Sequence, residues 1–443
     1  MYFENFLLVV DWACIPFFWW FLLRLAGLRL FVFSIPTIVF VAIIVFQYIG
    51  LPILYFKLDE YRALFVTDSD LVLTVGVATT FVTTQMLIGF IFGRTLFGPL
   101  KVSNFESNLN KKKIGVGAAL LLLLSILVLI LYIQNVGISK LVLFAVINSS
   151  SDNISLLRSD LGNSFVGKYY RYQLFFRETM IFSTLILYAQ YLIDKRRGSF
   201  LLFLIGLCGV ILSSVMSGEK APVVYAFVSL FFVKCLIKEE GRLEIKRLVP
   251  MLITSTILLI FGYQYFMNTE GYFQALSNLS SRAFAGALQP SYHYLDMFPK
   301  HHEFLAGRSF PNPMGIFPFE NYRLTVEVMN WANVNPELLD SGVVGSMPAM
   351  FWGELYANFG FEGLIGFPVV VGIMLYWLNA TVVRFGTNSV TAALLSWLAM
   401  HYKTLAETSI SSFLVDLPLI TILFFTILIL FYASNGRIRL RSH

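Results

Sequence analysis

Apolar runs separated by short polar stretches recur along almost the whole chain. A helix needs about 20 mainly apolar residues to cross the hydrocarbon core of a bilayer. No block of soluble-domain length separates the runs, so the pattern predicts an all-α polytopic membrane protein with about eleven transmembrane helices in a single transmembrane domain, residues 1–443. The predicted spans are 5–23, 31–56, 70–92, 114–133, 175–193, 199–215, 221–237, 248–267, 348–382, 390–410 and 414–433.

Basic residues between these runs predict the orientation, because Lys and Arg are retained on the cytoplasmic side during insertion. Every second connection is short and basic, and together these connections hold 19 of the 32 Lys and Arg residues. The other basic residues are spread over much longer segments. The basic connections are therefore predicted to be cytoplasmic, and the odd number of spans places the N-terminus outside.

Two predicted outer segments are long enough to hold a site: a first loop, 134–174, and a larger loop, 268–346. The larger loop contains or borders seven of the fifteen prolines, which set fixed bends in the backbone. We expect it to lie on the membrane surface, with an amphipathic helix at about 272–298.

Composition agrees with the apolar runs and excludes several other classes of protein. The chain is 57% hydrophobic and 13% charged, against about 25% charged in ordinary soluble domains. Its net charge of +6 comes from basic residues at the ends of apolar runs, which argues against nucleic-acid binding. The three cysteines have no metal-ligand spacing and support neither a disulfide framework nor a zinc site. The first run lacks a cleavage pattern and is expected to remain as a span.

Arginines on the outer side are candidates for binding a diphosphate, because a guanidinium fork matches phosphate oxygens and stays charged. Anionic lipid headgroups, or pairing with Asp160, Glu178 and Glu320, are the alternative roles. Arg282, inside the predicted interfacial helix, is the favoured candidate. The six arginines are Arg158, Arg171, Arg177, Arg282, Arg308 and Arg323.

Other ionisable residues near the membrane are functional candidates because charge at that depth is costly. Lys220 follows Glu219 in a tight turn, where it either touches substrate phosphate or only neutralises Glu219. Glu354 and Asn358 are four residues apart and share a helix face. Glu354 is either a general base or a hydrogen-bonding group that holds a broken helix.

A second pair with the same spacing, Lys403 and Glu407, is most simply an intrahelical ion pair. His302 is a candidate acid, base or phosphate donor beside His301, although surface histidines usually have no specific role. Asp11 lies inside the first span with no obvious partner.

Four motifs resemble the O-antigen polymerase family, which polymerises lipid-linked oligosaccharide repeats. They are SGEKAPVVYAF (217–227), SRAF (281–284), FWGELYANFGFEGLIG (351–366) and KTLAE (403–407). Their order and spacing, with two outer loops, carry the resemblance from about Ile147 onward. Related O-antigen ligases carry a histidine just before the returning membrane segment, whereas residues 346–350 here contain none, which favours a polymerase.

The resemblance implies a bacterial inner-membrane enzyme of the GT-C-like lipid-carrier glycosyltransferase class, with its active site facing the periplasm. It implies a metal-independent reaction without a cofactor. The substrate would be an oligosaccharide linked to undecaprenyl diphosphate, and a chain-length regulator (polysaccharide co-polymerase) would be a partner. The product would be O-antigen or a similar surface polysaccharide.

These expectations assign roles to particular residues. Glu354 or His302 would take the proton from the acceptor hydroxyl, and Asn358, Lys403 and Glu407 would support the site. Cations would stabilise the departing diphosphate. The predicted diphosphate-binding residues are Arg282, Lys220, Arg158, Arg177 and Arg323.

Two other functions fit the same pattern. A transporter or flippase of lipid-linked sugar would place polar residues along a path through many spans, whereas here they cluster on the outer side. An O-antigen ligase or another carrier-dependent transferase would differ only in its acceptor.

Overall fold

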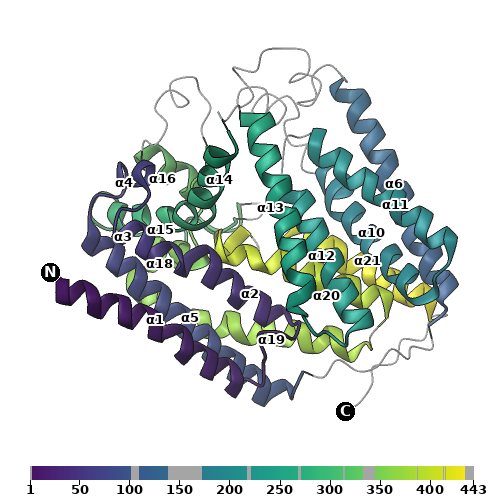
Figure 1. Ribbon diagram of the computed structural model, residues 1–443, viewed down its shortest axis with the longest axis horizontal. Coiled ribbons are helices and arrows are strands. Elements are labelled where there is room, and N and C mark those ends of the chain that lie inside the picture. Colours follow the sequence, from purple (N-terminus) through teal and green to yellow (C-terminus); the bar gives the residue numbers. More distant parts are fainter. Residues whose placement is uncertain are drawn as a thin grey trace. The chain divides into compact units, whose positions relative to one another are not determined.

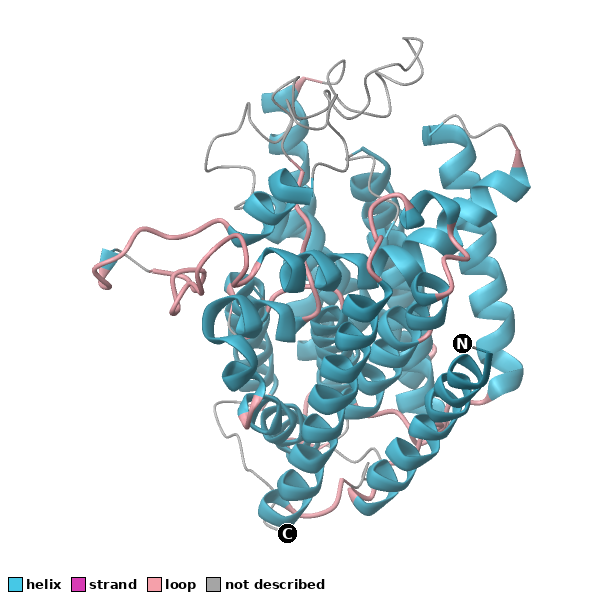
Figure 2. Cartoon of the chain, turned by 90° about the vertical axis from the view of Figure 1, so that its left-hand side faces the viewer, coloured by secondary structure: helices cyan, strands magenta, loops and turns pink. Residues whose placement is uncertain are grey.

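Helices make up all the regular structure in the described part of the chain, and no strand occurs there (Figures 1 and 2). Six helices are long and apolar enough to cross a membrane by length and composition. The helical membrane class is thus supported, while the count of eleven spans stays a prediction. The computed structural model describes residues 2–100, 109–137, 172–216, 221–267, 271–312, 315–332, 345–386, 388–412, 414 and 416–434.

The six helices that satisfy the membrane criteria each coincide with a predicted apolar run. They span Ile35–Tyr55, Ser69–Phe97, Lys111–Val136, Arg197–Ser214, Ala221–Lys238 and Phe367–Arg384. Other helices occupy the remaining runs: α1 (Tyr2–Leu25), η3 (Leu174–Thr179) with α10 (Met180–Asp194), α13 (Ile245–Met267), α20 (Ser389–Tyr402) and α21 (Leu417–Ala433).

Short polar side chains mark where several of these helices begin. Asp68 accepts hydrogen bonds from the N–H groups of Asp70 and Leu71 at the start of α5 (Ser69–Phe97). Asn110 does the same for α6 (Lys111–Val136), and Asp416 caps α21. These caps satisfy backbone donors that have no partner inside the helix.

The chain divides into two compact units. Unit 1 contains residues 1–100, 277–380 and 401–415, and unit 2 contains residues 101–276, 381–400 and 416–443.

Unit 2 is built around α10, which packs against α6, α11 (Arg197–Met216) and α12 (Ala221–Lys238). On α6, Leu121 and Leu122 are buried, whereas Leu120 is 60% exposed. A row of exposed leucines on a long helix is what lipid contact requires, because hydrocarbon solvates such side chains as well as a protein core does.

Unit 1 contains α1, α2 (Ile35–Ile43), η1 (Ile44–Tyr48), α3 (Gly50–Tyr55), α4 (Glu60–Ala63) and α5. It also contains the first part of α19 (Phe367–Arg384). Helices α5 and α19 cross backbone to backbone, because a methyl group at Gly89 would collide with the carbonyl oxygen of Val369. One at Gly372 would collide with the carbonyl oxygen of Met86. Small residues allow such close crossings in membranes.

The predicted span 348–382 is broken in the structure. It forms α18 (Phe351–Phe359), the 3-10 helix η6 (Gly360–Leu364) and then α19. Gly360 and Gly366 have φ of +64° and +79°, which a helix cannot accommodate. The buried Gln85 of α5 bridges the break, because its amide donates to the carbonyl oxygen of Leu364 (2.7 Å) and accepts from the N–H of Gly366 (2.7 Å).

The predicted span 390–410 also ends early. The α-helix α20 stops at Tyr402 and is followed by the 3-10 helices η7 (Lys403–Ala406) and η8 (Ile410–Ser412). Non-helical backbone near membrane depth is tolerated where it is buried in protein, and most of η7 is buried.

The predicted helix at 272–298 is present as α14 (Tyr272–Ser280), the π-helix η4 (Ser281–Ala285) and α15 (Gly286–Met297). Its second half differs from the surface helix that the sequence predicts, because α15 is buried from Leu288 to Leu295. A further helix of the larger outer loop is α16 (Leu324–Ala332). Most of the first outer loop, 138–171, lies outside the described residues.

Replacing Gly89 with Ala should lower the free energy of unfolding by about 1–3 kcal/mol, because the added methyl group has no room at the α5–α19 crossing. Thermal unfolding of the purified protein in detergent measures the change. Gly115→Ala in α6 is the matched control, since no heavy atom lies within 4 Å of its added methyl group. Equal unfolding temperatures for the two variants would contradict the close crossing.

Candidate functional site

Three of the four motif segments lie together in unit 1. Residues 281–284 form most of η4, residues 351–366 form α18 and η6, and residues 403–407 contain η7. Helix α15, which continues η4, packs against α18, and α18 packs against η8. The fourth motif begins at residues 217–220, which lie outside the described residues, and continues in unit 2.

The π-helix η1 joins α15 to the 403–407 segment through one side chain. Gln47 is fully buried, and its amide nitrogen donates to the carbonyl oxygens of Ala287 (2.9 Å) and Ala406 (2.6 Å). Gly50, which follows η1, has no Cβ, and a Cβ there would lie 2.5 Å from the carbonyl oxygen of Phe284. Gly50 thus allows η4 to lie directly against α3.

Glu354 is the central group of a buried hydrogen-bond network. Its carboxylate is 2% exposed, and one oxygen accepts from the hydroxyls of Ser309 (2.9 Å) and Ser411 (2.6 Å). The other oxygen accepts from the backbone N–H of Ser411 (2.8 Å). The carboxylate therefore joins α18 to the 305–309 segment and to η8.

Asn358 shares the helix face of Glu354, as its spacing predicts. Its amide nitrogen donates to the hydroxyl of Ser309 and to the carbonyl oxygen of Glu354, both at 2.7 Å. Its carbonyl oxygen accepts from the N–H of Gly307 (2.8 Å). The two residues therefore belong to one network, in which Asn358 holds the 305–309 segment against α18.

His302 lies on the neighbouring segment, between the rings of Phe298 (5.3 Å) and Tyr322 (5.2 Å). Its Nδ1 lies 2.8 Å from the carbonyl oxygen of Glu303. A carbonyl oxygen only accepts, so Nδ1 carries a proton, and in the neutral ring Nε2 has a lone pair that can accept another. This arrangement is chemically suited to a general base.

Lys403 and Glu407 form an ion pair with 2.6 Å between Nζ and Oε2. Lys403 is buried, and its ammonium also lies 5.1 Å from the ring centroid of Phe46. The pair sits in a 3-10 turn, where the sequence predicted a continuous helix. The pair lies just before η8, whose Ser411 donates hydrogen bonds to Glu354.

The structure describes three of the five predicted diphosphate-binding residues. Arg282 and Arg323 are exposed and belong to unit 1, Arg282 on η4 and Arg323 just before α16. Arg177 belongs to unit 2. Arg158 and Lys220 lie outside the described residues, so their predicted roles stay predictions.

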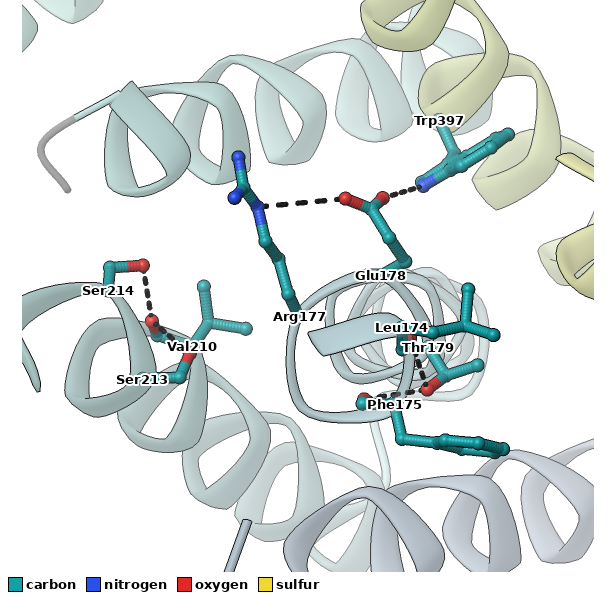
Figure 3. A network of polar contacts seen from close by, with 9 residues as sticks. All are labelled: Leu174, Phe175, Arg177, Glu178, Thr179, Val210, Ser213, Ser214 and Trp397. Atoms are coloured by element: carbon teal, nitrogen blue, oxygen red, sulfur yellow. Dashed lines mark hydrogen bonds and ion pairs between the residues drawn. The ribbon is translucent and has the colours of Figure 1, made fainter. Parts of the chain in front are cut away.

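Arg177 lies in the π-helix η3 and is close to a carboxylate (Figure 3). Its Nε is 3.7 Å from Oε1 of Glu178, and Oε2 of Glu178 accepts from the indole N–H of Trp397 (3.0 Å). Pairing with Glu178 was the alternative role for this arginine, and the structure contains that pair.

Arg62 is a site residue that the sequence argument missed. It lies on α4 and donates from Nη1 to the side-chain oxygen of Gln289 on α15. A Cβ at Gly286 would lie 2.8 Å from its Nη2, so the guanidinium rests on the turn directly after η4. The available signal was a lone arginine in the short outer connection between the second and third runs.

The Arg62 contact continues into the core of unit 1. Gln289 Nε2 lies 3.1 Å from Nε2 of His293, which must accept because Gln289 uses its oxygen for Arg62. Burial lowers the pKa of His293 to about 4, the charge of Asp296 opposes this shift, and that of Arg62 adds to it. His293 is therefore neutral at physiological pH.

Comparison of the chain with protein-family models, curated proteins and solved structures finds no match.

Proposed function

We propose that the protein polymerises oligosaccharide repeats carried on undecaprenyl diphosphate, at the periplasmic face of the bacterial inner membrane. The observation that supports this most is that unit 1 brings residues 281–284, 351–366 and 403–407 together, where Gln47 donates to Ala287 and Ala406 and Glu354 accepts from Ser411. These segments are far apart in sequence, and they are the ones on which the resemblance to O-antigen polymerases depends.

The proposed reaction is a glycosyl transfer between two lipid-linked chains. An acceptor hydroxyl forms a bond to the anomeric carbon of the donor, whose bond to the diphosphate oxygen breaks. The electron pair stays on the departing carrier diphosphate, and the hydroxyl proton passes to a base. The reaction thus needs cations for the diphosphate and one proton acceptor. In this proposal the cations are side chains, and the reaction is metal-independent.

Arg282 and Arg62 are the proposed diphosphate-binding residues of unit 1. Arg282 is exposed on η4, and Arg62 lies against Gly286 in the next turn. Arginine suits this role because its planar fork pairs with two phosphate oxygens at once. Arg323, also in unit 1, is a further candidate for this ligand, whereas the roles predicted for Arg177, Arg158 and Lys220 stay predictions.

His302 is the proposed general base, and Glu354 is proposed to position the site. Both oxygens of Glu354 already accept hydrogen bonds from Ser309 and Ser411. In the neutral ring of His302, Nδ1 donates to Glu303 and Nε2 is left to accept a proton. Of the two candidate bases, the histidine thus meets the chemical requirement better.

Replacing His302 with Ala should lower kcat by about 10²–10⁴-fold, the usual contribution of a general base. The measurement is elongation of purified lipid-linked repeats by the protein in detergent, followed by product length. His301→Ala is the control, since the neighbouring ring packs on Trp331 at 4.4 Å. Activity of His302→Ala within a few-fold of wild type would remove His302 as the base.

The same assay separates this function from its alternatives. Detergent has no compartments, so a transporter or flippase would elongate nothing there. A ligase would transfer the chain to a lipid A core acceptor rather than to another repeat. Wild-type protein that fails to lengthen the lipid-linked chains under these conditions would contradict the proposed polymerase.

Membranes containing Arg282→Ala or Arg62→Ala should produce glycans of single repeats rather than long chains, because the leaving diphosphate loses a cation. Product length on a gel shows the change. Lys300→Ala is the matched control, being an exposed cation of the same outer segment. Normal chain lengths in either arginine variant would exclude that arginine from the diphosphate site.

A further inference from the structure

A groove of about 510 Å³ lies between α1, α3 and α5 in unit 1. Its walls are mainly apolar and include Ile15, Leu51 and Val77. Along α5 it extends from Val72 to Thr84, or about 18 Å at the rise of an α-helix. That length is close to one leaflet of a hydrocarbon core about 30 Å thick. The groove therefore matches a single lipid chain from one leaflet.

A carboxylate lines this groove at a defined depth. Helices α1 and α5 run side by side, because Trp19 donates to Thr84 (3.0 Å) and Arg94 donates to the carbonyl oxygen of Leu25 (2.7 Å). Asp11, about two turns before Trp19, is therefore nearly level with Gly76, and both residues line the groove.

That level is close to the predicted outer boundary of the hydrocarbon. Helix α5 has 29 residues, about 43 Å in length, and so exceeds a core of about 30 Å by several residues at each end. The groove end at Val72 is opposite the end that carries Arg24 and Arg94, which the basic residues assign to the cytoplasm. Asp11 thus faces the groove near the headgroups of the outer leaflet.

A second carboxylate, that of Asp70, lies on the face of α5 that lines the groove. Asp70 lies three residues before Leu73 and seven before Val77, both of which line the groove. In the described part of the chain, neither Asp11 nor Asp70 forms an ion pair. The adjoining connection, residues 57–70, is also acidic overall, with four Asp or Glu against Lys57 and Arg62. Arg62 donates to Gln289 on α15.

We propose that this groove binds a bilayer lipid with a primary ammonium headgroup. Its hydrocarbon chain lies along α5, and its ammonium donates hydrogen bonds to Asp11 and reaches Asp70. An ammonium offers three donors and a charge that complements the carboxylates. An anionic headgroup would be repelled by the two carboxylates, which carry the same charge. This groove and the proposed diphosphate site of Arg282 and Arg62 therefore select lipids of different chemistry.

The test is native mass spectrometry of the full-length protein with an equal mixture of phosphatidylethanolamine and phosphatidylglycerol. Wild type should retain about tenfold more phosphatidylethanolamine, the ratio expected for one charge-assisted hydrogen bond. Asp11→Asn should reduce this preference to about twofold or less. Glu362→Gln, which changes an exposed carboxylate on η6, should leave it unchanged.

A second variant tests the groove itself. Thr80→Phe places a ring inside the groove and should reduce retention of phosphatidylethanolamine several-fold, with an unfolding temperature close to that of wild type. Equal retention of both lipids by wild type, or an unchanged preference in Asp11→Asn, would overturn the proposal. So would full retention in Thr80→Phe. None of these outcomes depends on polymerase activity.

Discussion

Unit 1 depends on one constraint: a backbone N–H or C=O group that is buried away from water must find a partner inside the protein. A long helix satisfies this by itself, but the chain is broken after α18 and again after α20, where η6, η7 and η8 are short. Polar side chains supply the missing partners. Gln85 closes the gap between η6 and α19, and Gln47 reaches the carbonyl oxygens of Ala287 and Ala406.

The same constraint explains why Glu354 and Asn358 lie where they do. Between them they bind the N–H groups of Ser411 and Gly307, which belong to segments that lie outside regular α-helices. A buried carboxylate is stable only when it is well hydrogen-bonded, and Ser309 and Ser411 complete its shell. The residues that hold the broken segments are therefore also the ones that shape the candidate site, which places His302 and Arg282 on a fixed support.

Local sequence patterns predicted much of this arrangement. Apolar runs of sufficient length identified the helices, because membrane thickness sets that length directly. Four-residue spacing predicted that Glu354 and Asn358 share a face and that Lys403 pairs with Glu407, since such neighbours meet on one helix turn. The broken helix that one interpretation of Glu354 required is present, since η6 separates α18 from α19.

Contacts between distant segments were beyond the reach of those patterns. Arg62 touches α15 only because the tertiary fold brings α4 to Gly286, and nothing local to Arg62 encodes that contact. The predicted surface helix is buried at α15 for the same reason, since burial depends on what packs around it. The charge of Arg177 did indicate an ionic interaction, but its neighbour Glu178 is the observed partner.

The π-helices η1 and η4 contact each other, and this fixes more than a local bend. A π turn holds one residue more than an α turn, so each absorbs one excess residue while the helix beyond it keeps the facing of an uninterrupted helix. Deleting one residue from η4 would therefore return that turn to the α register and leave the buried face of α15 where it is. A deletion within α15 itself has no such buffer and would turn everything after it by about 100°, the angle of one residue in an α-helix. The chain thus tolerates a change of length at η4 better than in the helix that follows it.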